Sequence, residues 1–349
     1  MDKAAGMKIL CVITSMGPGG AERQLCGLAA MLARSGHEVR LRWFDGKPFY
    51  RDELDAAGVE YMRLGAWSRF GRAWMLGLSV SIHKPDVVIA FLDGAAMAAC
   101  TLKRGGGKFR LIVSERNVSQ SLEGREAEKF KAYRHADAIV CNSATQAGLV
   151  GRHFPELAPK LHTIRNFVDL EHFRPMPSAS RPDTTLRIVT VARTAEQKNP
   201  GRFVEAARKA VAEGLDVEFD WYGASGQWLS SEGPVRFHPA VGDVRAVYCA
   251  ADALCLPSLY EGFPNAVCEA MACGLPVLCS DVCDNGSLVG DGVNGFLFDP
   301  HSAGSIAEAL SRFAALPESG KAEMGAASRR RAEEILSPDA FLAAWKEIL

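Results

Sequence analysis

The chain has 349 residues and a formal net charge of -1 at neutral pH, with 48% hydrophobic and 23% charged residues. This balance is typical of a soluble globular protein and gives no electrostatic reason to expect a nucleic acid as a partner. The length exceeds that of one ordinary core and predicts two domains with a cleft between them.

Residues 1–16 lack the apolar core of a signal peptide. No later stretch reaches the roughly 18 apolar residues that a membrane-spanning helix needs. We therefore expect a cytoplasmic protein without a membrane span.

Short aliphatic or β-branched runs alternate with amphipathic stretches along the first half of the chain. This alternation predicts βαβ units and a mainly parallel sheet that helices cover on both faces. The expected strands lie at 7–14, 38–44, 59–64, 85–92, 109–115, 136–143 and 161–168.

A proline- and serine-rich linker at 166–185 interrupts this pattern, which then starts again. We therefore expect a second Rossmann-like domain. Its strands are predicted at 186–193, 216–223, 235–240, 251–258, 275–281 and 294–299.

Near the end of the chain, Ser337 and Pro338 form a helix start signal before an apolar stripe that includes Trp345. This stripe must pack against another part of the protein. We expect an N-terminal domain at 1–170, a C-terminal domain at 171–335, and a C-terminal helix at 336–349 that crosses back to the N-terminal domain.

In open α/β sheets, ligands bind at the carboxyl ends of the strands, so the loops there are candidate sites. The first such loop contains Gly17, Gly19 and Gly20 and opens a helix at about Ala21. Glycines let a ligand approach the backbone, and the free amides of a helix start attract an anion. A glycine-rich turn with a purely structural role is the alternative.

The first loop of the second domain carries two cations. Arg193 ends a strand, and Lys198 follows five residues later, before Asn199 and Pro200, which read as the N-cap and first residue of a helix. A guanidinium can grip two phosphate oxygens while an ammonium acts as a point charge, so this pair suits a diphosphate. A solvated basic turn is the alternative.

A third loop follows the buried strand at 251–258. It contains Glu261, and Glu269 lies eight positions later on the second turn of a helix that stops at Gly274. Carboxylates accept hydrogen bonds from hydroxyl groups, of which a sugar offers many. Surface charge would explain each glutamate alone, but the two together with the nearby cations predict a nucleotide-sugar site.

The start of this helix completes the expected donor site. Its free backbone amides should point toward anything bound there, as phosphate sites at helix starts do. The residues concerned are Gly262, Phe263, Pro264 and Asn265, of which all but the proline offer an amide.

The segment EGFPNAVCE, which holds both glutamates, resembles the E-x7-E motif of the retaining GT-B glycosyltransferases of family 4. Four further segments resemble family motifs in the family's order and spacing: GPGGAERQL, RNFVD, VARTAEQKNP and DGVNGFLFDP. The resemblance covers essentially the whole chain and is strongest to enzymes that extend lipid-linked oligosaccharides or polysaccharide repeat units. It implies the GT-B fold, with two Rossmann-like domains and a cleft between them.

The resemblance also implies residue roles. Glu269 would hold the nucleotide ribose and Glu261 the hydroxyls of the transferred sugar. Arg193 and Lys198 would neutralise the diphosphate, because fixed cations in a dry site stabilise the charge that develops on the leaving group. No metal or other cofactor is therefore implied. The amides expected to assist belong to Gly19, Gly20, Gly262 and Phe263.

One segment departs from the family pattern. Many relatives carry a histidine near the sugar after a late strand of the first domain, where this chain has Glu115, Arg116 and Asn117. Glu115 is a candidate contact to the acceptor or sugar, with a structural ion pair at the strand end as the alternative. Arg116 and Asn117 are acceptor candidates, Arg116 through a phosphate. The catalytic candidates are Glu261, Glu115, Arg193 and Lys198.

The stretch 63–84 combines an apolar helical face with several cations. The face includes Phe70, Trp74 and Ile82, while Arg69 and Arg72 add positive charge. Such a helix suits an anionic membrane or a lipid diphosphate. Burial against the sheet is the alternative. The acceptor or membrane candidates here are Arg69, Arg72 and Trp74.

Taken together, the sequence predicts a retaining transferase that moves a sugar from a nucleotide diphosphate to a polyprenyl-diphosphate-linked or other glycan acceptor. By family frequency the donor is a UDP-linked hexose or N-acetylhexosamine. We expect the enzyme to be cytoplasmic and peripheral at the inner face of the membrane. A nucleotide-sugar epimerase of the same architecture is the alternative, and a two-domain solute-binding protein is a third reading that the missing export signal disfavours.

Overall fold

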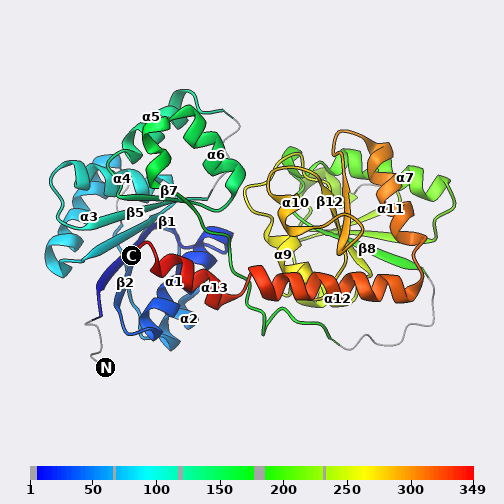
Figure 1. Ribbon diagram of the computed structural model, residues 1–349, viewed down its shortest axis with the longest axis horizontal. Coiled ribbons are helices and arrows are strands. Elements are labelled where there is room, and N and C mark those ends of the chain that lie inside the picture. The colour runs from blue at the N-terminus through cyan, green and yellow to red at the C-terminus, as the bar shows by residue number, and fades with distance from the viewer. Residues whose placement is uncertain (1–5, 66–67, 117–120, 177–184, 231–232) are drawn as a thin grey trace. The chain divides into compact units, whose positions relative to one another are not determined.

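The computed structural model of the chain describes residues 6–65, 68–116, 121–176, 185–230 and 233–349 (Figure 1). The acceptor candidate Asn117 lies outside the described residues. The chain divides into two compact units, one formed by Met1–Asn166 with Asp339–Leu349 and the other by Phe167–Pro338. We call them the N-terminal and the C-terminal unit.

The N-terminal unit is built on a seven-stranded sheet in the order β3-β2-β1-β4-β5-β6-β7, in which all neighbouring strands are parallel. The predicted parallel architecture is therefore confirmed. The strands are β1 (Lys8–Ser15), β2 (Glu38–Asp45), β3 (Glu60–Arg63), β4 (Val87–Phe91), β5 (Arg110–Glu115), β6 (Ala138–Cys141) and β7 (Leu161–Thr163).

Helices cover both faces of this sheet (Figure 1). One face carries α3 (Arg69–His83), α4 (Asp93–Arg104), α5 (Gly124–Tyr133) and α6 (Ala144–His153), and a 3-10 turn, η1 (Pro155–Lys160), follows α6. The other face carries α1 (Gly20–Arg34), α2 (Arg51–Ala56) and α13 (Pro338–Lys346).

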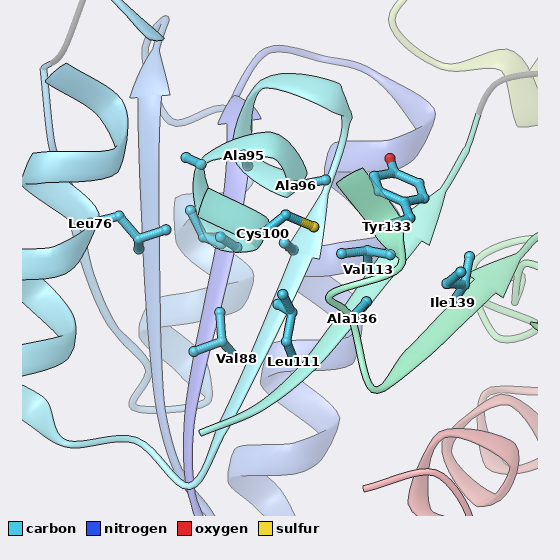
Figure 2. Packing of buried hydrophobic residues seen from close by; sticks show 14 of the residues in the cluster. Leu76, Val88, Ala95, Ala96, Cys100, Leu111, Val113, Tyr133, Ala136 and Ile139 are labelled. Carbon is cyan, nitrogen blue, oxygen red and sulfur yellow. The ribbon is translucent and has the colours of Figure 1, made fainter. Parts of the chain in front are cut away.

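The core between α4 and the strands depends on small side chains. Figure 2 shows alanines and a cysteine of α4 directly over aliphatic residues of β4 and β5, so that this helix lies close to the sheet. Tight packing of this kind leaves little room for larger residues on that face. The labelled residues of these three elements are Ala95, Ala96, Cys100, Val88, Leu111 and Val113.

The helix α13 belongs to the N-terminal unit, although it follows the C-terminal unit in sequence. The indole of Trp345 is fully buried and stacks on the ring of Phe91 at the end of β4, with 5.8 Å between the ring centroids. Arg110 Nε also donates a 2.9 Å hydrogen bond to the carbonyl of Ile348. The apolar stripe seen in the sequence is thus part of this unit's core.

The C-terminal unit is built on a six-stranded parallel sheet in the order β10-β9-β8-β11-β12-β13. The strands are β8 (Leu186–Val191), β9 (Val217–Tyr222), β10 (Val235–His238), β11 (Ala253–Leu256), β12 (Val277–Ser280) and β13 (Gly295–Phe298). One core packs α9 and α12 on the sheet, and a second packs α7 and α11 on it.

The helical elements of the C-terminal unit alternate with these strands. The longer helices are α7 (Pro200–Ala212), α9 (Asn265–Ala272), α11 (Ala303–Ala314) and α12 (Glu318–Ile335). The shorter elements are η2 (Glu196–Lys198), η3 (Gly226–Ser230), α8 (Val244–Cys249) and α10 (Asn285–Leu288).

Each sheet has one point where the strand order reverses, between β1 and β4 in the first and between β8 and β11 in the second. Loops at the carboxyl ends of the two strands that flank such a point run in opposite directions and leave space for a ligand. The loops after β8 and β11 are the two that carry the predicted cations and the first glutamate. The topology therefore explains why residues far apart in sequence come together there.

Replacing Trp345 tests the packing of α13. Trp345→Ala removes a fully buried indole, so we expect the unfolding free energy of the N-terminal unit to fall by about 3 to 5 kcal/mol. Hydrogen–deuterium exchange should accelerate in peptides from β4 and β5 and stay constant in peptides from β11 and β12. The control is Lys346→Ala at the exposed neighbouring position. Equal exchange in both variants would contradict the packing role.

Candidate functional site

Two of the predicted donor residues, Lys198 and Glu261, meet where β8 and β11 end. The side chain of Lys198, in the loop after β8, places Nζ 2.5 Å from Oε1 of Glu261, in the loop after β11. Glu261 is only 4% exposed. A carboxylate this buried needs a partner, and Lys198 supplies the positive charge. The sequence placed both residues in the site but did not predict their direct contact.

Backbone and amide hydrogen bonds hold these two loops together. The amide N–H of Leu259 donates to the carbonyl of Gln197 at 2.8 Å, and Gln197 Nε2 donates back to the carbonyl of Tyr260 at 2.9 Å. The loop that carries Glu261 is thereby fixed to the loop that carries Lys198. Sequence reasoning missed Gln197, because nothing in its spacing distinguishes it from a solvent-exposed glutamine.

Asn199 stands directly before Pro200 at the start of α7, as the sequence predicts. It occupies the N-cap position of α7, but its backbone is left-handed, with φ 58° and ψ 45°, and its side chain accepts no capping hydrogen bond. Its amide Nδ2 donates instead to the carbonyls of Pro257 at 3.2 Å and Pro300 at 2.8 Å. Asparagine tolerates this backbone conformation better than most residues. The predicted helix start is therefore confirmed, although the side chain of Asn199 bonds to neighbouring loops rather than to the helix.

Arg193 lies just beyond the end of β8 and is exposed. Within the described part of the chain, its guanidinium forms no ion pair, whereas the Lys198 ammonium is held by Glu261. The two predicted cations thus differ in state: one is fixed and partly buried, the other is exposed to solvent.

The second glutamate lies inside the unit. Glu269, on α9, is buried, and the fully buried Tyr248 of α8 donates a hydrogen bond from Oη to Glu269 Oε2 at 3.3 Å. Tyr248 was missed in the sequence, where it reads only as a core aromatic. Hydrogen bonding from a rigid phenol orients the carboxylate.

The start of α9 differs in one respect from the expectation. The amide N–H of Asn265 donates to the carbonyl of Phe263 at 3.0 Å, so it does not point outward to a ligand. The tight turn before the helix satisfies this donor locally, as happens at many helix ends. The expected outward direction of this amide was wrong.

In the N-terminal unit, the helix start at Gly19 and Gly20 already has an anion nearby. A Cβ atom added to Gly19 would lie 2.1 Å from Oε2 of Glu22, whose carboxylate folds back over the first turn of α1 and accepts a 2.6 Å hydrogen bond from Ser15 Oγ. A side chain at position 19 would therefore displace the carboxylate of Glu22. This geometry supports the structural alternative for this turn, and the donor contact at Gly19 and Gly20 stays a prediction.

Glu115 ends β5 and is almost completely buried. Its Oε2 lies 2.7 Å from Nζ of Lys129 on α5, and Tyr133 Oη donates to the same oxygen at 3.5 Å. Lys129 also lies 2.7 Å from a carboxylate oxygen of Glu126. Burial and the negative charge of Glu115 together raise the pKa of Tyr133. These contacts favour the structural ion pair over a contact to the acceptor or sugar.

Arg116 is also buried. Its Nη2 donates to Oδ1 of Asn166, and its guanidinium lies over the ring of Phe91, 5.0 Å from the centroid. Burial lowers the pKa of Arg116 to about 10, so the group stays cationic at neutral pH. The sequence did not predict that Arg116 would be held inside the unit.

The helix α3 exposes part of its apolar face. Trp74 is 69% exposed, whereas Ala73 and Leu76 pack into the core, so the helix is only partly buried against the sheet. Arg69 and Arg72 line a cavity of about 200 Å³ between α3, α4 and α5. Arg72 also forms a 2.7 Å ion pair with Asp45. Of these candidates, Arg69 and Arg72 share a site and Trp74 lies outside it.

Two kinds of feature are absent from the described residues. None of the helices there is both long and apolar enough to cross a membrane. In the same residues, histidine, cysteine, aspartate and glutamate side chains form no group of three or more suited to hold a metal ion.

Solved structures of glycosyltransferases share this fold. A glycosyltransferase from Rickettsia africae superposes with a TM-score of 0.82 at 15% identity, covering 98% of this chain and 97% of that one. HepE from Anabaena, solved in complex with UDP and glucose, superposes with a TM-score of 0.81 at 17% identity and covers 98% of each chain. The two parallel α/β units therefore have the GT-B fold, which confirms the predicted fold class.

Family models and curated relatives agree with this class. The model described as Glycosyltransferase Family 4 matches residues 18–172, and the one described as Glycosyl transferases group 1 matches residues 185–315. The chain belongs to glycosyltransferase family 4, which confirms the resemblance of its motifs.

Two relatives illustrate the range of the family. A D-inositol 3-phosphate glycosyltransferase from Streptomyces scabiei is 30% identical over 227 residues, or 57% of this chain and 51% of the relative. An alpha-1,4-N-acetyl-D-galactosaminyltransferase from Campylobacter jejuni, named for a PP-undecaprenol-linked glycan, is 27% identical over 283 residues, or 76% of this chain and 77% of the relative. The chain spans about half the length of the Streptomyces relatives it matches.

Replacing Glu115 separates its two suggested roles. Glu115→Ala leaves the buried ammonium of Lys129 with a weaker set of partners, so we expect a loss of about 3 kcal/mol in unfolding free energy and a lower melting temperature. Glu126→Ala, which removes a more exposed partner of the same lysine, is the control and should cost less than about 1 kcal/mol. An unchanged melting temperature with lost sugar transfer would instead favour the acceptor contact.

Proposed function

We propose that this protein is a retaining glycosyltransferase that moves a sugar from a UDP-linked hexose or N-acetylhexosamine to a lipid-linked glycan acceptor. One observation carries the proposal: the loops after β8 and β11 meet at the switch point of the C-terminal sheet and bring the Lys198–Glu261 pair there. Family membership supports the reaction class.

Arg193 and Lys198 bind the donor diphosphate in this proposal. An ammonium has three donors, and Glu261 uses one of them on Lys198, so two stay available for phosphate oxygens. The exposed guanidinium of Arg193 can close onto a second pair of oxygens with a forked contact. These two cations stabilise the charge that develops on the diphosphate, and we therefore propose a reaction that needs no metal ion.

Glu261 and Glu269 hold different parts of the donor. Glu261, which lies before α9, accepts hydrogen bonds from hydroxyls of the transferred sugar while it keeps Lys198 in place. Glu269, which Tyr248 orients from behind, accepts the ribose hydroxyls. Each carboxylate oxygen has room for more than one hydrogen bond, so a protein partner does not prevent ligand binding.

The proposed step breaks the bond between the sugar's anomeric carbon and the diphosphate oxygen and forms a bond to an acceptor hydroxyl on the same face. The departing phosphate oxygen takes the acceptor's proton, so the products are the glycosylated acceptor and protonated UDP. Glu115 is not assigned as the base, because its carboxylate is buried against Lys129. The configuration at the anomeric carbon is retained.

The acceptor is proposed from the relatives. The name of the Campylobacter jejuni enzyme contains a PP-undecaprenol-linked glycan, and the Anabaena structure contains UDP and glucose. A polyprenyl diphosphate acceptor would require the enzyme to work at the inner face of a membrane, as a cytoplasmic or peripheral protein. Arg69, Arg72 and Arg116 remain our candidates for contact with the acceptor.

Removing both donor cations tests the diphosphate assignment. Arg193→Ala with Lys198→Ala should weaken UDP binding by at least about a hundredfold, because two charge-assisted hydrogen bonds are each worth about 1.5 to 3 kcal/mol. Titration calorimetry with UDP measures this. The control is Arg208→Ala with Arg330→Ala, two exposed cations elsewhere on the unit. Wild-type affinity in the first double variant would remove these cations from the site.

Replacing Glu261 tests its sugar role. Glu261→Gln keeps the size of the side chain but removes its charge, so we expect turnover of the preferred UDP-sugar to fall about a hundredfold, or roughly 3 kcal/mol of barrier. The affinity for UDP should change less than about threefold, because Glu269 and the cations remain. A screen of UDP-sugars for acceptor-independent hydrolysis selects the donor. Wild-type turnover, or release of an isomerised free nucleotide sugar in place of transfer, would contradict the proposal.

A further inference from the structure

One face of α3 presents a ridge of apolar side chains to solvent. Phe70, Trp74, Leu78 and Ile82 recur at every fourth position and are 85%, 69%, 46% and 65% exposed. Residues four apart lie on the same side of a helix, so these four side chains form one continuous stripe. We call this stripe the ridge.

The ridge is separate from the face of α3 that stabilises the fold. Ala73, Leu76 and Ser79 are the buried residues of this helix, and Leu76 points into the core of the N-terminal unit (Figure 2). The small residues among them let the helix lie close to its neighbour. The large apolar residues are therefore left on the outside, although exposing them is unfavourable in water.

Positive charge accompanies the ridge. The helix contains no aspartate or glutamate, while Arg69 stands at its first position and Lys84 just after its last. Both cations are exposed. Long basic side chains at the ends of an apolar helical face can keep their stems in an apolar layer and their charges at its surface.

The second feature is a groove that begins at Arg69. This residue also lines a groove of about 270 Å³ between α4 and α5. The basic and acidic residues of the groove are Arg69, Arg104, Lys131, Arg134, His135 and Glu128, so cations outnumber carboxylates. Burial and the charges of Arg134, Arg104 and Lys160 lower the pKa of His135, in line with a positive potential there.

We propose that the ridge and the groove dock the N-terminal unit on an anionic lipid bilayer. The ridge side chains enter the boundary between head groups and acyl chains, and the groove cations contact lipid phosphates. This inference rests on the proposed function in one respect: docking would serve the reaction because a lipid-linked acceptor lies in such a bilayer. The sequence placed an aromatic residue and two arginines at a membrane contact but did not find the groove.

The dimensions and charges fit a bilayer surface better than a second copy of this chain. The 15 residues of α3 span about 22 Å, which is less than the roughly 30 Å of the hydrocarbon layer, so the helix would lie in the plane of the interface. Two copies joined through their ridges would bring the arginines and lysines of both helices together. Anionic head groups attract the same charges, and tryptophan is a residue favoured at that depth.

Flotation of the full chain with lipid vesicles tests the proposal. We expect binding to vesicles of phosphatidylcholine with phosphatidylglycerol, little binding to phosphatidylcholine alone, and weaker binding as salt is raised. Phe70→Gln with Ile82→Gln should lower the partition coefficient about tenfold or more. Its control is Leu229→Gln with Val293→Gln, two exposed apolar residues of the C-terminal unit.

The groove has its own variant. Arg104→Glu with Lys131→Glu should lower partitioning to anionic vesicles by more than about tenfold, since each cation near such a surface contributes about fivefold. Arg208→Glu with Arg330→Glu is the matched charge control. Trp74→Phe keeps the ridge apolar and should reduce the quenching of protein fluorescence by brominated lipids.

Several results would overturn the proposal: equal binding to neutral and anionic vesicles, wild-type flotation of the ridge or groove variant, or unchanged quenching in Trp74→Phe. A lipid-free dimer that Phe70→Gln with Ile82→Gln converts to a monomer would assign the ridge to self-association instead. UDP affinity is measured on the same variants. Lost flotation with intact UDP binding would leave the donor assignment standing, whereas absent UDP binding in the wild type would count against the proposed function alone.

Discussion

The buried ion pair between Lys198 and Glu261 is the contact on which the C-terminal site depends. A carboxylate so far from water is stable only beside a fixed cation, and each of these side chains belongs to a different loop at the switch point of the sheet. Gln197 and Asn199 add hydrogen bonds between the same loops. In the proposed reaction, the positions of both charges are therefore set before the donor binds, which limits the reorganisation that binding and charge development require.

Much of this site follows from sequence pattern, because parallel βαβ units put every strand's carboxyl end on one edge. The loops with Arg193 and Glu261 were predicted on that ground together with the family motifs. The side-chain contacts were not predictable in the same way. Asn199 was predicted as the N-cap of a helix, but its hydrogen bonds to the carbonyls of Pro257 and Pro300 were not, and Tyr248 gives no signal beyond its hydrophobicity. Such contacts depend on residues that only the folded chain brings together.

In the N-terminal unit, too, side-chain contacts could not be predicted from the sequence, and there they argue against a proposed site residue. Glu115 stood out in the sequence as a departure from the family pattern, but its partner Lys129 lies on the next helix and turns the position into a buried ion pair. For α3, periodicity predicted an apolar face without saying which way it turns. The orientation of α3 is set by Ala73 and Leu76, whose side chains pack into the core, so Trp74 is left exposed. Which face of a helix is buried depends on the residues of the neighbouring helix as well as on its own.

The place of α13 has a consequence for how the protein is made. Phe91 and its sheet are synthesised before Trp345, which covers that ring and follows the entire C-terminal unit. At about 5 to 20 residues per second, the gap between the two residues lasts roughly 13 to 50 s, long compared with the folding of a small domain. During that time the nascent N-terminal unit carries an uncovered apolar surface at the end of β4, which makes it a candidate for chaperone binding. The unit is completed only when its last helix closes over the strand.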